Sequence, residues 1–280
     1  MTGAATAMLK GKRALVTGAT AGLGLAVAES LASAGANIIL HDLVEPKATA
    51  DQLRSRLDVE VTSVAADLSQ RASIEAMMAD LLGLGAIDIL VNNAVVRHFA
   101  PVENFAPERW DEALAVNLSA PFHLIRLALP AMKARNWGRI INMASIYSTR
   151  AVADRIDYVT TKTAILGMTR AVAIETATSG ITCNAISPGT LPTPAIQRKI
   201  ASIATMKAGP LTRRRGTIWR RASRADGSSA WKASERWLSS SPARLDRTSP
   251  ARPCRSMEAG PPHEHKRPIA EMMILPVNRY

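Results

Sequence analysis

The chain has 280 residues, two cysteines and a formal net charge of +12 at pH 7. Two cysteines provide no disulfide framework or metal cluster, and no apolar run reaches membrane-spanning length. The charge is uneven, because residues 201–280 carry sixteen Lys and Arg against six Asp and Glu, whereas residues 1–200 carry nineteen against seventeen. No secretory signal precedes Met8. We therefore expect a cytoplasmic protein without a metal site, not embedded in a membrane.

A strand, a glycine-rich turn and a helix are the first predicted elements. The apolar run 13–17 leads into Thr17-Gly-Ala-Thr-Ala-Gly-Leu-Gly24, and residues 25–34 have helical spacing. Gly18 permits a tight turn, Gly22 lets the backbone approach a pyrophosphate, and Gly24 allows close helix packing. Amide groups at the start of the helix then point toward phosphate. This order of elements predicts a dinucleotide site.

The second strand, residues 37–40, is followed by Asp42. A carboxylate about 20 residues beyond such a turn meets the adenosine ribose. It would repel a phosphate on that ribose, which favours NAD over NADP. The alternative is an ordinary solvated aspartate in a turn.

Strands and helices continue to alternate along the chain. Residues 87–91 and 139–143 are almost wholly apolar, as in parallel strands covered on both faces. Helical patterns cover residues 107–117 and 121–134. The alternation predicts an α/β fold with a doubly wound parallel sheet.

Tyr158 and Lys162 lie four residues apart on a predicted helix, with Ser145 upstream. This spacing puts the phenol and the ammonium on one helical face, where the positive charge favours the phenolate. A phenol of this kind can exchange a proton with a substrate hydroxyl. The pattern predicts a general acid/base for alcohol and ketone chemistry.

These motifs together resemble the short-chain dehydrogenase/reductase family over roughly residues 8 to 200. The resemblance implies a Rossmann-like sheet with NAD as cofactor, and a catalytic tetrad of Asn117, Ser145, Tyr158 and Lys162. In that tetrad Tyr158 is the acid/base, Ser145 orients the substrate oxygen, Lys162 binds the nicotinamide ribose, and Asn117 holds a relay water. The residues implied to meet the cofactor are Thr17, Gly18, Gly22, Leu23, Gly24, Asp42, Asp67, Leu68, Asn93, Ala94, Tyr158, Lys162, Pro188, Gly189 and Thr193.

One position in this stretch departs from the family. Glycine normally follows the Asn-Asn-Ala segment, and here Val95 takes that position. A branched side chain there would crowd the cofactor or require a small backbone shift.

Within the family the chain resembles the bacterial 3-hydroxybutyrate dehydrogenases, although the substrate positions differ. Those positions carry Arg97, Tyr147, Arg155 and Lys199, and Thr190 replaces a tryptophan. A guanidinium can hold a carboxylate in a bidentate pair, so a small hydroxy or keto acid is the expected substrate. The loss of the tryptophan favours an acid larger than hydroxybutyrate. The alternative is that each basic residue is a solvated surface charge.

The last part of the chain does not match the family as written. A match appears when the reading frame is shifted back by one base. Each new codon then takes the third base of one residue's codon and the first two bases of the next residue's codon. Met257 followed by Glu258 then encodes glycine, and its neighbours permit Val-Asp-Gly-Gly-Trp, a segment typical of the family's C-terminus. The same shift permits Asp-Ile-Thr-Gly over residues 247–251, Thr-Val-Ala-Phe-Leu over 235–240 and Leu-Ala-Ala-Arg-Gln-Pro over 218–224. We interpret residues from about 205 onward as a frameshifted translation.

This interpretation predicts a Rossmann-like domain over residues 1–204 and a basic, irregular tail over residues 205–280. The tail lacks the family's lid and seventh strand, and the segment that builds its dimers and homotetramers, so we expect six strands and an exposed sheet edge. Two hypotheses follow: an NAD-dependent oxidoreductase, or an inactive frameshift product that retains at most nucleotide binding. A basic tail can also indicate nucleic-acid binding, but the frameshift explains its charge, and we expect no nucleic-acid partner.

Overall fold

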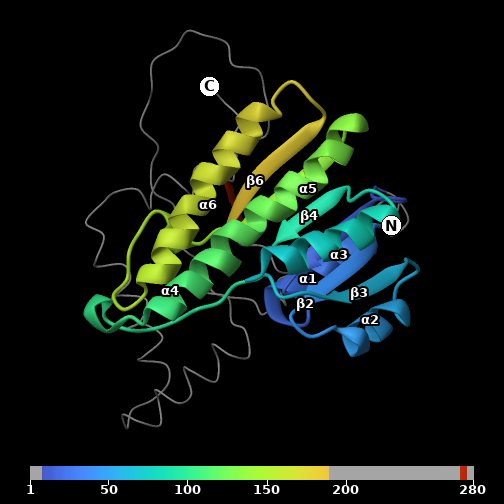
Figure 1. Cartoon of the computed structure of the whole chain (residues 1–280). Helices are drawn as coiled ribbons and strands as arrows, with labels where there is room; N and C mark the ends of the chain where they lie inside the picture. The colour runs from blue at the N-terminus through green and yellow to red at the C-terminus, as the bar shows by residue number, and fades with distance from the viewer. Residues whose placement is uncertain (1–7, 189–271, 276–280) are drawn as a thin grey trace, which may run out of the picture. The chain divides into compact units, whose positions relative to one another are not determined.

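The computed structural model describes residues 8–188 and 272–275. Its strands form one sheet in the order β3-β2-β1-β4-β5-β6-β7 (Figure 1). The strands are β1 (Arg13–Thr17), β2 (Asn37–Asp42), β3 (Val61–Ala65), β4 (Ile89–Asn92), β5 (Gly138–Met143), β6 (Ile181–Pro188) and β7 (Met272–Leu275). The first six are parallel, which confirms the predicted doubly wound sheet.

Helices cover both faces of this sheet. They are α1 (Gly22–Ser33), α2 (Lys47–Arg54), α3 (Arg71–Gly83), α4 (Pro107–Leu114), α5 (Ala120–Ala134) and α6 (Ile156–Glu175), with short helical segments η2 (Val102–Asn104), η3 (Ala115–Ser119) and η4 (Ile146–Ser148). Side chains of α3, α5 and α6 share one core with Leu15, Leu90 and Ile140, and those of α1 and α2 share another with Ala14 and Val16.

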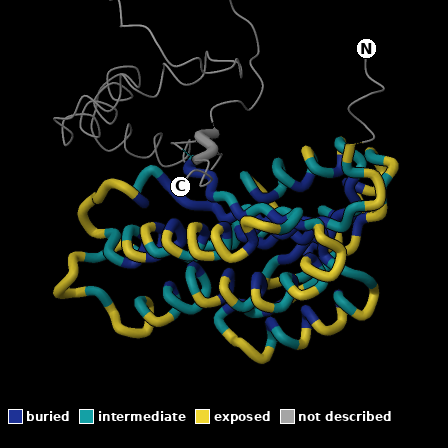
Figure 2. Tube along the Cα trace, turned by 90° about the horizontal axis from the view of Figure 1, so that it is seen from above, coloured by how far each residue is buried: buried dark blue, intermediate teal, exposed yellow. Residues whose placement is uncertain are grey.

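Alternate residues of the parallel strands therefore enter opposite cores. Burial on both faces explains why these strands read as continuous apolar runs. Figure 2 shows the buried residues gathered along the strands, with exposed residues on the outward turns of the helices.

The strand order changes direction at β1, which lies between β2 and β4. Successive crossovers leave such a point toward opposite sides of the sheet, and in open parallel sheets this arrangement forms a crevice beyond the carboxyl ends of the strands, here β1 and β4. Ligands of open parallel sheets bind in such a crevice. The glycine-rich turn after β1 and the Asn93–Ala94 segment after β4 both lie there.

The edge of β6 differs from the expectation of an exposed edge. Met272–Leu275 forms β7, which pairs with β6 in antiparallel orientation, Leu275 opposite Ala185 and Met272 opposite Pro188. Among the described residues there is thus no seventh parallel strand, as predicted, whereas the prediction of an unpaired edge is wrong. Unpaired N–H and C=O groups at an edge accept any extended segment, and the apolar run Met-Met-Ile-Leu supplies one.

One helical stretch among the described residues, Pro107–Ala134, is long and apolar enough to cross a membrane by length and composition alone. Its most apolar window is 44% buried inside the domain. Residues of α5, including Leu124 and Ala128, belong to the core that covers the sheet. The stretch is therefore a core helix of the α/β domain.

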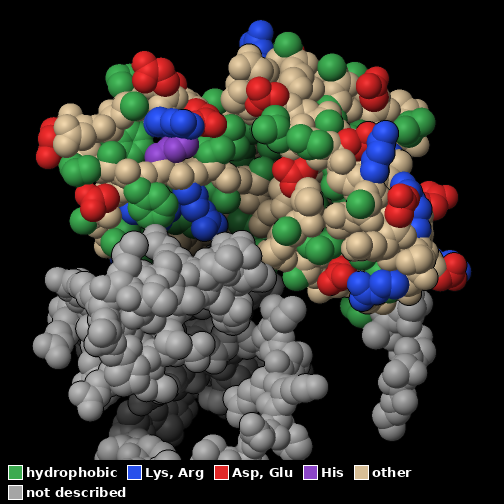
Figure 3. All heavy atoms as spheres, turned by 90° about the horizontal axis from the view of Figure 1, so that it is seen from below, with side chains coloured by type: hydrophobic (Ala, Val, Ile, Leu, Met, Phe, Trp, Pro, Cys, Tyr) green, Lys and Arg blue, Asp and Glu red, His purple; other side chains and the backbone are tan. Residues whose placement is uncertain are grey.

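Charges of both signs are interspersed on the face in Figure 3, where acidic and basic side chains lie side by side. This mixture agrees with the near balance of charge in residues 1–200.

Candidate active site

Ser145 follows β5 and begins the short helix η4. Its Oγ accepts a hydrogen bond from Tyr147 N at 3.2 Å, and its own N–H donates to Ser148 Oγ at 3.1 Å. This reciprocal capping fixes the backbone on both sides of the hydroxyl. Ser145 is 5% exposed, so its Oγ is held in a defined, nearly buried position.

Tyr158 and Lys162 lie one turn apart on α6, and both are largely buried. Lys162 Nζ donates to the carbonyl of Met143, two residues before Ser145. The ring of Tyr147, two residues after Ser145, meets the Tyr158 ring edge-on with 6.4 Å between centroids. These two contacts, one on each side of Ser145, bring the three predicted catalytic residues together.

Asn117 lies in η3, a π-helical turn between α4 and α5. Its Oδ1 accepts from Val96 N at 2.9 Å, and its Nδ2 donates to Val96 O at 3.0 Å and contacts Thr161 Oγ1 at 3.5 Å. Asn117 thereby joins the loop after β4 to α6. Protein partners therefore occupy both the oxygen and the nitrogen of the Asn117 side-chain amide.

The ammonium of Lys162 is the most perturbed cation of this group. Burial lowers the pKa of Lys162 to about 7, and the positive charge of Arg97 acts in the same direction. Near neutral pH the side chain therefore exchanges readily between charged and neutral forms. A perturbed titratable group beside a buried phenol is typical of an active site.

The glycine-rich turn has the geometry that its sequence predicts. Gly18 and Gly22 both have φ of +62°, and a Cβ on Gly22 would meet no atom within 4 Å, which leaves room beside it. A Cβ on Gly24 would lie 2.2 Å from Gly18 O. The start of α1 carries no side-chain cap, so its N–H groups remain available to phosphate oxygens.

Thr17 supports this turn from beneath. Its hydroxyl is buried, donates to Val91 O at 3.3 Å and accepts from the N–H groups of Asn93 and Ala94 at 3.0 Å. Asn93 Nδ2 donates to the carbonyls of Thr17 and Gly18 at 2.9 Å. Both side chains therefore hold the turn against the end of β4.

Asp42 ends β2 beside the turn. Its Oδ2 accepts from Thr20 N at 3.2 Å and Thr20 Oγ1 at 2.6 Å, and its Oδ1 accepts from Leu43 N at 2.9 Å. It lines a pocket of about 390 Å³ together with Thr20, Leu43, Val44, Glu45, Pro46, Lys47, Ala48 and Thr49. The carboxylate is thus fixed at the place where a ribose is expected.

The remaining predicted cofactor residues differ in what their side chains contact and in whether the structure describes them. Asp67 Oδ1 accepts from Ser69 N at 2.8 Å. The Leu68 side chain is buried in one core, and the partly buried Leu23 side chain packs against the other. Val95 does not have a positive φ, so its backbone does not require glycine. Pro188 ends β6, and Gly189, Thr193 and Lys199 lie outside the described residues.

Three of the four predicted substrate residues gather around Tyr158. Arg155 Cζ lies 4.6 Å and Arg97 Cζ 5.4 Å from the Tyr158 ring centroid, and Tyr147 forms the edge contact described above. Arg155 Cζ also lies 4.1 Å from the Phe99 ring centroid. Two guanidinium groups therefore flank the predicted acid/base.

Asp157 belongs to this cluster, and motif reasoning did not identify it. The residue is fully buried in the first turn of α6, and its Oδ2 accepts from His98 N at 3.1 Å. The signal in the sequence is a carboxylate directly before the tyrosine of the catalytic pair. The helical periodicity of the sequence alone does not decide whether Asp157 lies on the buried or the exposed face of α6.

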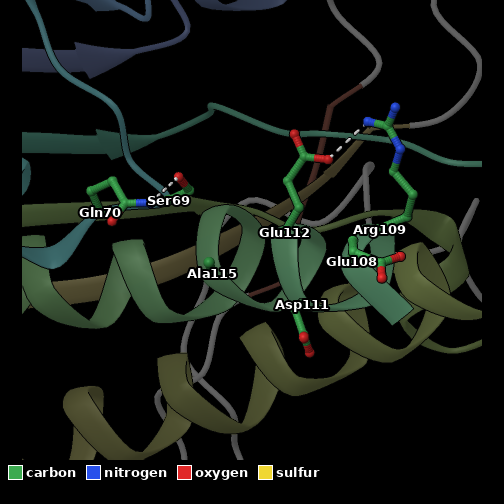
Figure 4. A pocket seen from close by; sticks show the side chains of 7 residues that line it. All are labelled: Ser69, Gln70, Glu108, Arg109, Asp111, Glu112 and Ala115. Carbon is green, nitrogen blue, oxygen red and sulfur yellow. Dashed lines mark hydrogen bonds and ion pairs between the residues drawn. The ribbon is translucent and has the colours of Figure 1, made fainter. Parts of the chain in front are cut away.

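Another pocket, of about 570 Å³, lies beside α4 (Figure 4). It is lined by Ser69, Gln70, Glu108, Arg109, Asp111, Glu112 and Ala115. It contains none of the predicted site residues, so its larger volume does not make it the active site. Among the residues that the structure describes, no group of three or more His, Cys, Asp or Glu side chains could hold a metal ion.

Known proteins share both the sequence and the fold. The D-beta-hydroxybutyrate dehydrogenase of Cupriavidus necator is 45% identical over 206 residues, which cover 73% of this chain and 80% of that protein. A second one, from Rhizobium meliloti, is 43% identical over 193 residues, or 68% of this chain and 75% of that protein.

Among solved structures, L-sorbose reductase from Gluconobacter frateurii, complexed with NADPH and L-sorbose, has a TM-score of 0.69 at 29% identity, covering 74% of this chain and 80% of that one. A putative NAD(P)-dependent gluconate 5-dehydrogenase from Beutenbergia cavernae with bound NADP has a TM-score of 0.66 at 34% identity, covering 70% and 80%. The family model described as short chain dehydrogenase matches residues 12–203. The chain therefore belongs to the short-chain dehydrogenase/reductase family of NAD(P)-dependent oxidoreductases.

Proposed function

We propose that the chain is an NAD-dependent dehydrogenase that interconverts a hydroxyl and a ketone on a small carboxylate-bearing substrate, as in 3-hydroxybutyrate. The observation that carries this proposal is the pair of guanidinium groups, Arg97 and Arg155, within 5.4 Å of the Tyr158 ring centroid. A carboxylate bound between them would bring a nearby hydroxyl to the phenol. The similarity to two D-beta-hydroxybutyrate dehydrogenases supports the same substrate class.

The catalytic roles follow from the arrangement of the side chains. The phenolate of Tyr158 takes the proton of the substrate hydroxyl, while Ser145 Oγ donates a hydrogen bond to the same oxygen. Lys162, when charged, stabilises the phenolate through space. The glycine-rich turn would hold NAD, which would supply the hydride acceptor. In the reverse direction, Tyr158 returns the proton to the carbonyl oxygen.

The chain's own residues fit a bound dinucleotide. Gly22 leaves open space beside the uncapped start of α1, which suits a pyrophosphate, and the Asp42 carboxylate suits ribose hydroxyls. A ribose phosphate there would face a negative charge. Lys47, the basic residue that lines this pocket, pairs with Glu45 at 3.3 Å. These contacts favour NAD over NADP.

The substrate proposal is tested by following NADH formation with D-3-hydroxybutyrate and with its neutral methyl ester. We expect the acid to be the better substrate, and Arg155→Met to raise the KM for the acid about tenfold while changing that for the ester little. A chain that oxidises the ester and the acid equally well would contradict the proposal.

The cofactor proposal is tested by titrating NAD and NADP and following intrinsic fluorescence. We expect tighter binding of NAD, and a narrower difference for Asp42→Ala, because the variant lacks the repelling carboxylate. Tighter binding of NADP by the unmodified chain would overturn this part of the proposal.

The second candidate is an inactive frameshift product. Two observations favour it: the match to the family model ends at residue 203, and the shifted codons beyond it permit family-like segments in the right order. Sequencing the encoding DNA across codons 195 to 260 tests this candidate. A missing or extra base would support it, and an intact frame would remove it. We infer a cytoplasmic location. The family's dimer or homotetramer is not expected for the chain as written, because its tail lacks the segment that builds that interface.

A further inference from the structure

Arg97 lies on a loop whose backbone is held on both sides. Before it, Val96 makes two hydrogen bonds with the Asn117 side chain, at 2.9 and 3.0 Å. After it, His98 N donates to Asp157 Oδ2 at 3.1 Å. Asn117 is 1% exposed and Asp157 is fully buried, whereas the Arg97 side chain is exposed. An exposed guanidinium therefore stands on a backbone fixed by two buried side chains.

The position of the Asp157 carboxylate destabilises the fold. Its Oδ1 is buried and has no hydrogen-bond partner, and a buried carboxylate with unsatisfied oxygens costs free energy. Part of this cost is offset by its place in the first turn of α6, where the helix dipole favours negative charge. A group kept at such a cost, directly before the acid/base, points to a role in the site.

Two guanidinium groups around one ring repel each other, and Asp157 offsets this repulsion. Burial lowers the pKa of Arg155, Arg97 lowers it further, and the Asp157 carboxylate raises it. One buried negative charge among two positive ones leaves a net single positive charge, which one substrate carboxylate neutralises.

We propose that Asp157 is a positioning residue, which holds the Arg97 guanidinium beside Tyr158 so that it meets the substrate carboxylate. This inference rests on the proposed function for the identity of the substrate. It assigns Asp157 no contact with substrate or cofactor, because its oxygen acts on the backbone of His98.

The kinetic test compares Asp157→Ala, Asp157→Asn and Arg97→Ala in the full chain with D-3-hydroxybutyrate and NAD. Asp157→Ala should raise the KM for the acid about tenfold with little change in kcat or in the KM for NAD, since only carboxylate binding is misaligned. Asp157→Asn keeps an oxygen that accepts from His98 N and should restore most of the affinity. In the Arg97→Ala background, Asp157→Ala should have no further effect on KM.

Additive effects of Arg97→Ala and Asp157→Ala, or an Asn variant as impaired as the Ala variant, would overturn the proposal. Glu112→Gln is the matched control. Glu112 Oε2 lies 3.1 Å from His98 Nε2, and the two atoms are within ion-pair distance without hydrogen-bond geometry. This variant changes a contact of the same His98 but leaves its backbone anchor, so the KM for the acid should stay unchanged.

Amide exchange separates this inference from the proposed function. In Asp157→Ala the His98 amide should exchange at least about tenfold faster, and in Asp157→Asn close to the original rate, whether or not the chain turns over the acid. If the unmodified chain neither binds nor oxidises 3-hydroxybutyrate, the proposed function fails while the exchange result still decides whether Asp157 anchors the loop. Unchanged His98 exchange in Asp157→Ala refutes the anchor.

Discussion

The two ends of the parallel sheet each hold a buried carboxylate among cations, and the carboxylates are treated differently. At the amino ends of β1, β4 and β5, Asp88 is 4% exposed and both of its oxygens have partners. Oδ2 accepts from Arg13 N at 2.9 Å, and Oδ1 lies 3.0 Å from Arg135 Nη2 and 3.8 Å from Lys12 Nζ. Both oxygens of this buried carboxylate are therefore paired with donors or cations.

At the carboxyl ends of the strands, several buried polar groups are unpaired. Among the described residues, buried atoms without a hydrogen-bond partner include Asn92 Oδ1 at the end of β4, and Arg155 Nε and Asp157 Oδ1 at the start of α6. Lys162 nearby is a buried ammonium with a pKa lowered by burial to about 7. Unsatisfied groups cost stability and persist where they serve a ligand. The comparison indicates that the buried charge at the amino end stabilises the fold, whereas the unpaired buried groups at the carboxyl end cost stability, as expected of a ligand site.

The largest expected effect is on turnover, at the carboxyl end. Tyr158→Phe removes the proton-transfer hydroxyl and leaves the ring that packs against Tyr147 and the two guanidinium groups. We expect kcat to fall roughly 100- to 10,000-fold, with NAD affinity and the melting temperature nearly unchanged. The measurement is steady-state NADH formation together with a cofactor titration, in the full chain or, if that proves inactive, in a version with the reading frame restored. Full activity of the phenylalanine variant would remove Tyr158 from its role.

The opposite pattern is expected at the amino end. Asp88→Ala leaves Arg13 N without its carboxylate partner and brings Lys12 and Arg135 together without a counter-charge. The free energy of unfolding should fall by about 1–3 kcal/mol, while the KM values stay unchanged. Urea unfolding followed by fluorescence measures this. Asp80→Ala, on the exposed face of α3, is the control and should change stability by less than about 0.5 kcal/mol.

At the carboxyl end of the sheet the sequence predicts the local patterns but not the contacts between distant residues. Strand and helix order, the glycine-rich turn and the spacing of Tyr158 and Lys162 are local patterns, so they are visible in the sequence. The anchoring of His98 by Asp157 joins residues 59 positions apart, and nothing local marks it. The pairing of β6 with Met272–Leu275 is equally non-local, because edge pairing depends on which extended segment reaches the edge rather than on a motif.

Gly24 gives a test of packing at the glycine-rich turn. A Cβ there would lie 2.2 Å from Gly18 O and 2.5 Å from Asn93 Nδ2, so Gly24→Ala must displace the turn. We expect a loss of about 1–2 kcal/mol in unfolding free energy and weaker NAD binding. Gly167→Ala is the matched control on α6, where a Cβ meets no atom within 4 Å. That variant should gain about 0.5–1 kcal/mol, since alanine favours the helix. Equal losses of unfolding free energy for both variants would show that the close contact at Gly24 is not the cause of the destabilisation.

The smallest expected change in stability, and the sharpest test of the contrast between the two ends, concerns Lys162. Replacing this buried ammonium with methionine should abolish turnover and yet stabilise the fold by about 1 kcal/mol near neutral pH, because the folded chain no longer buries a charge. The gain should depend on pH in a defined direction. Burial lowers the pKa of Lys162 from 10.5 to about 7, so between these values the unfolded chain binds the proton and the folded chain does not. The original chain therefore gains stability as pH rises through that window. Its difference from Lys162→Met should be largest below about pH 7 and should shrink toward pH 10. Thermal unfolding of both proteins across this range measures the difference. A constant difference, or a methionine variant that is less stable at neutral pH, would show that this end of the sheet does not give up stability for its catalytic lysine.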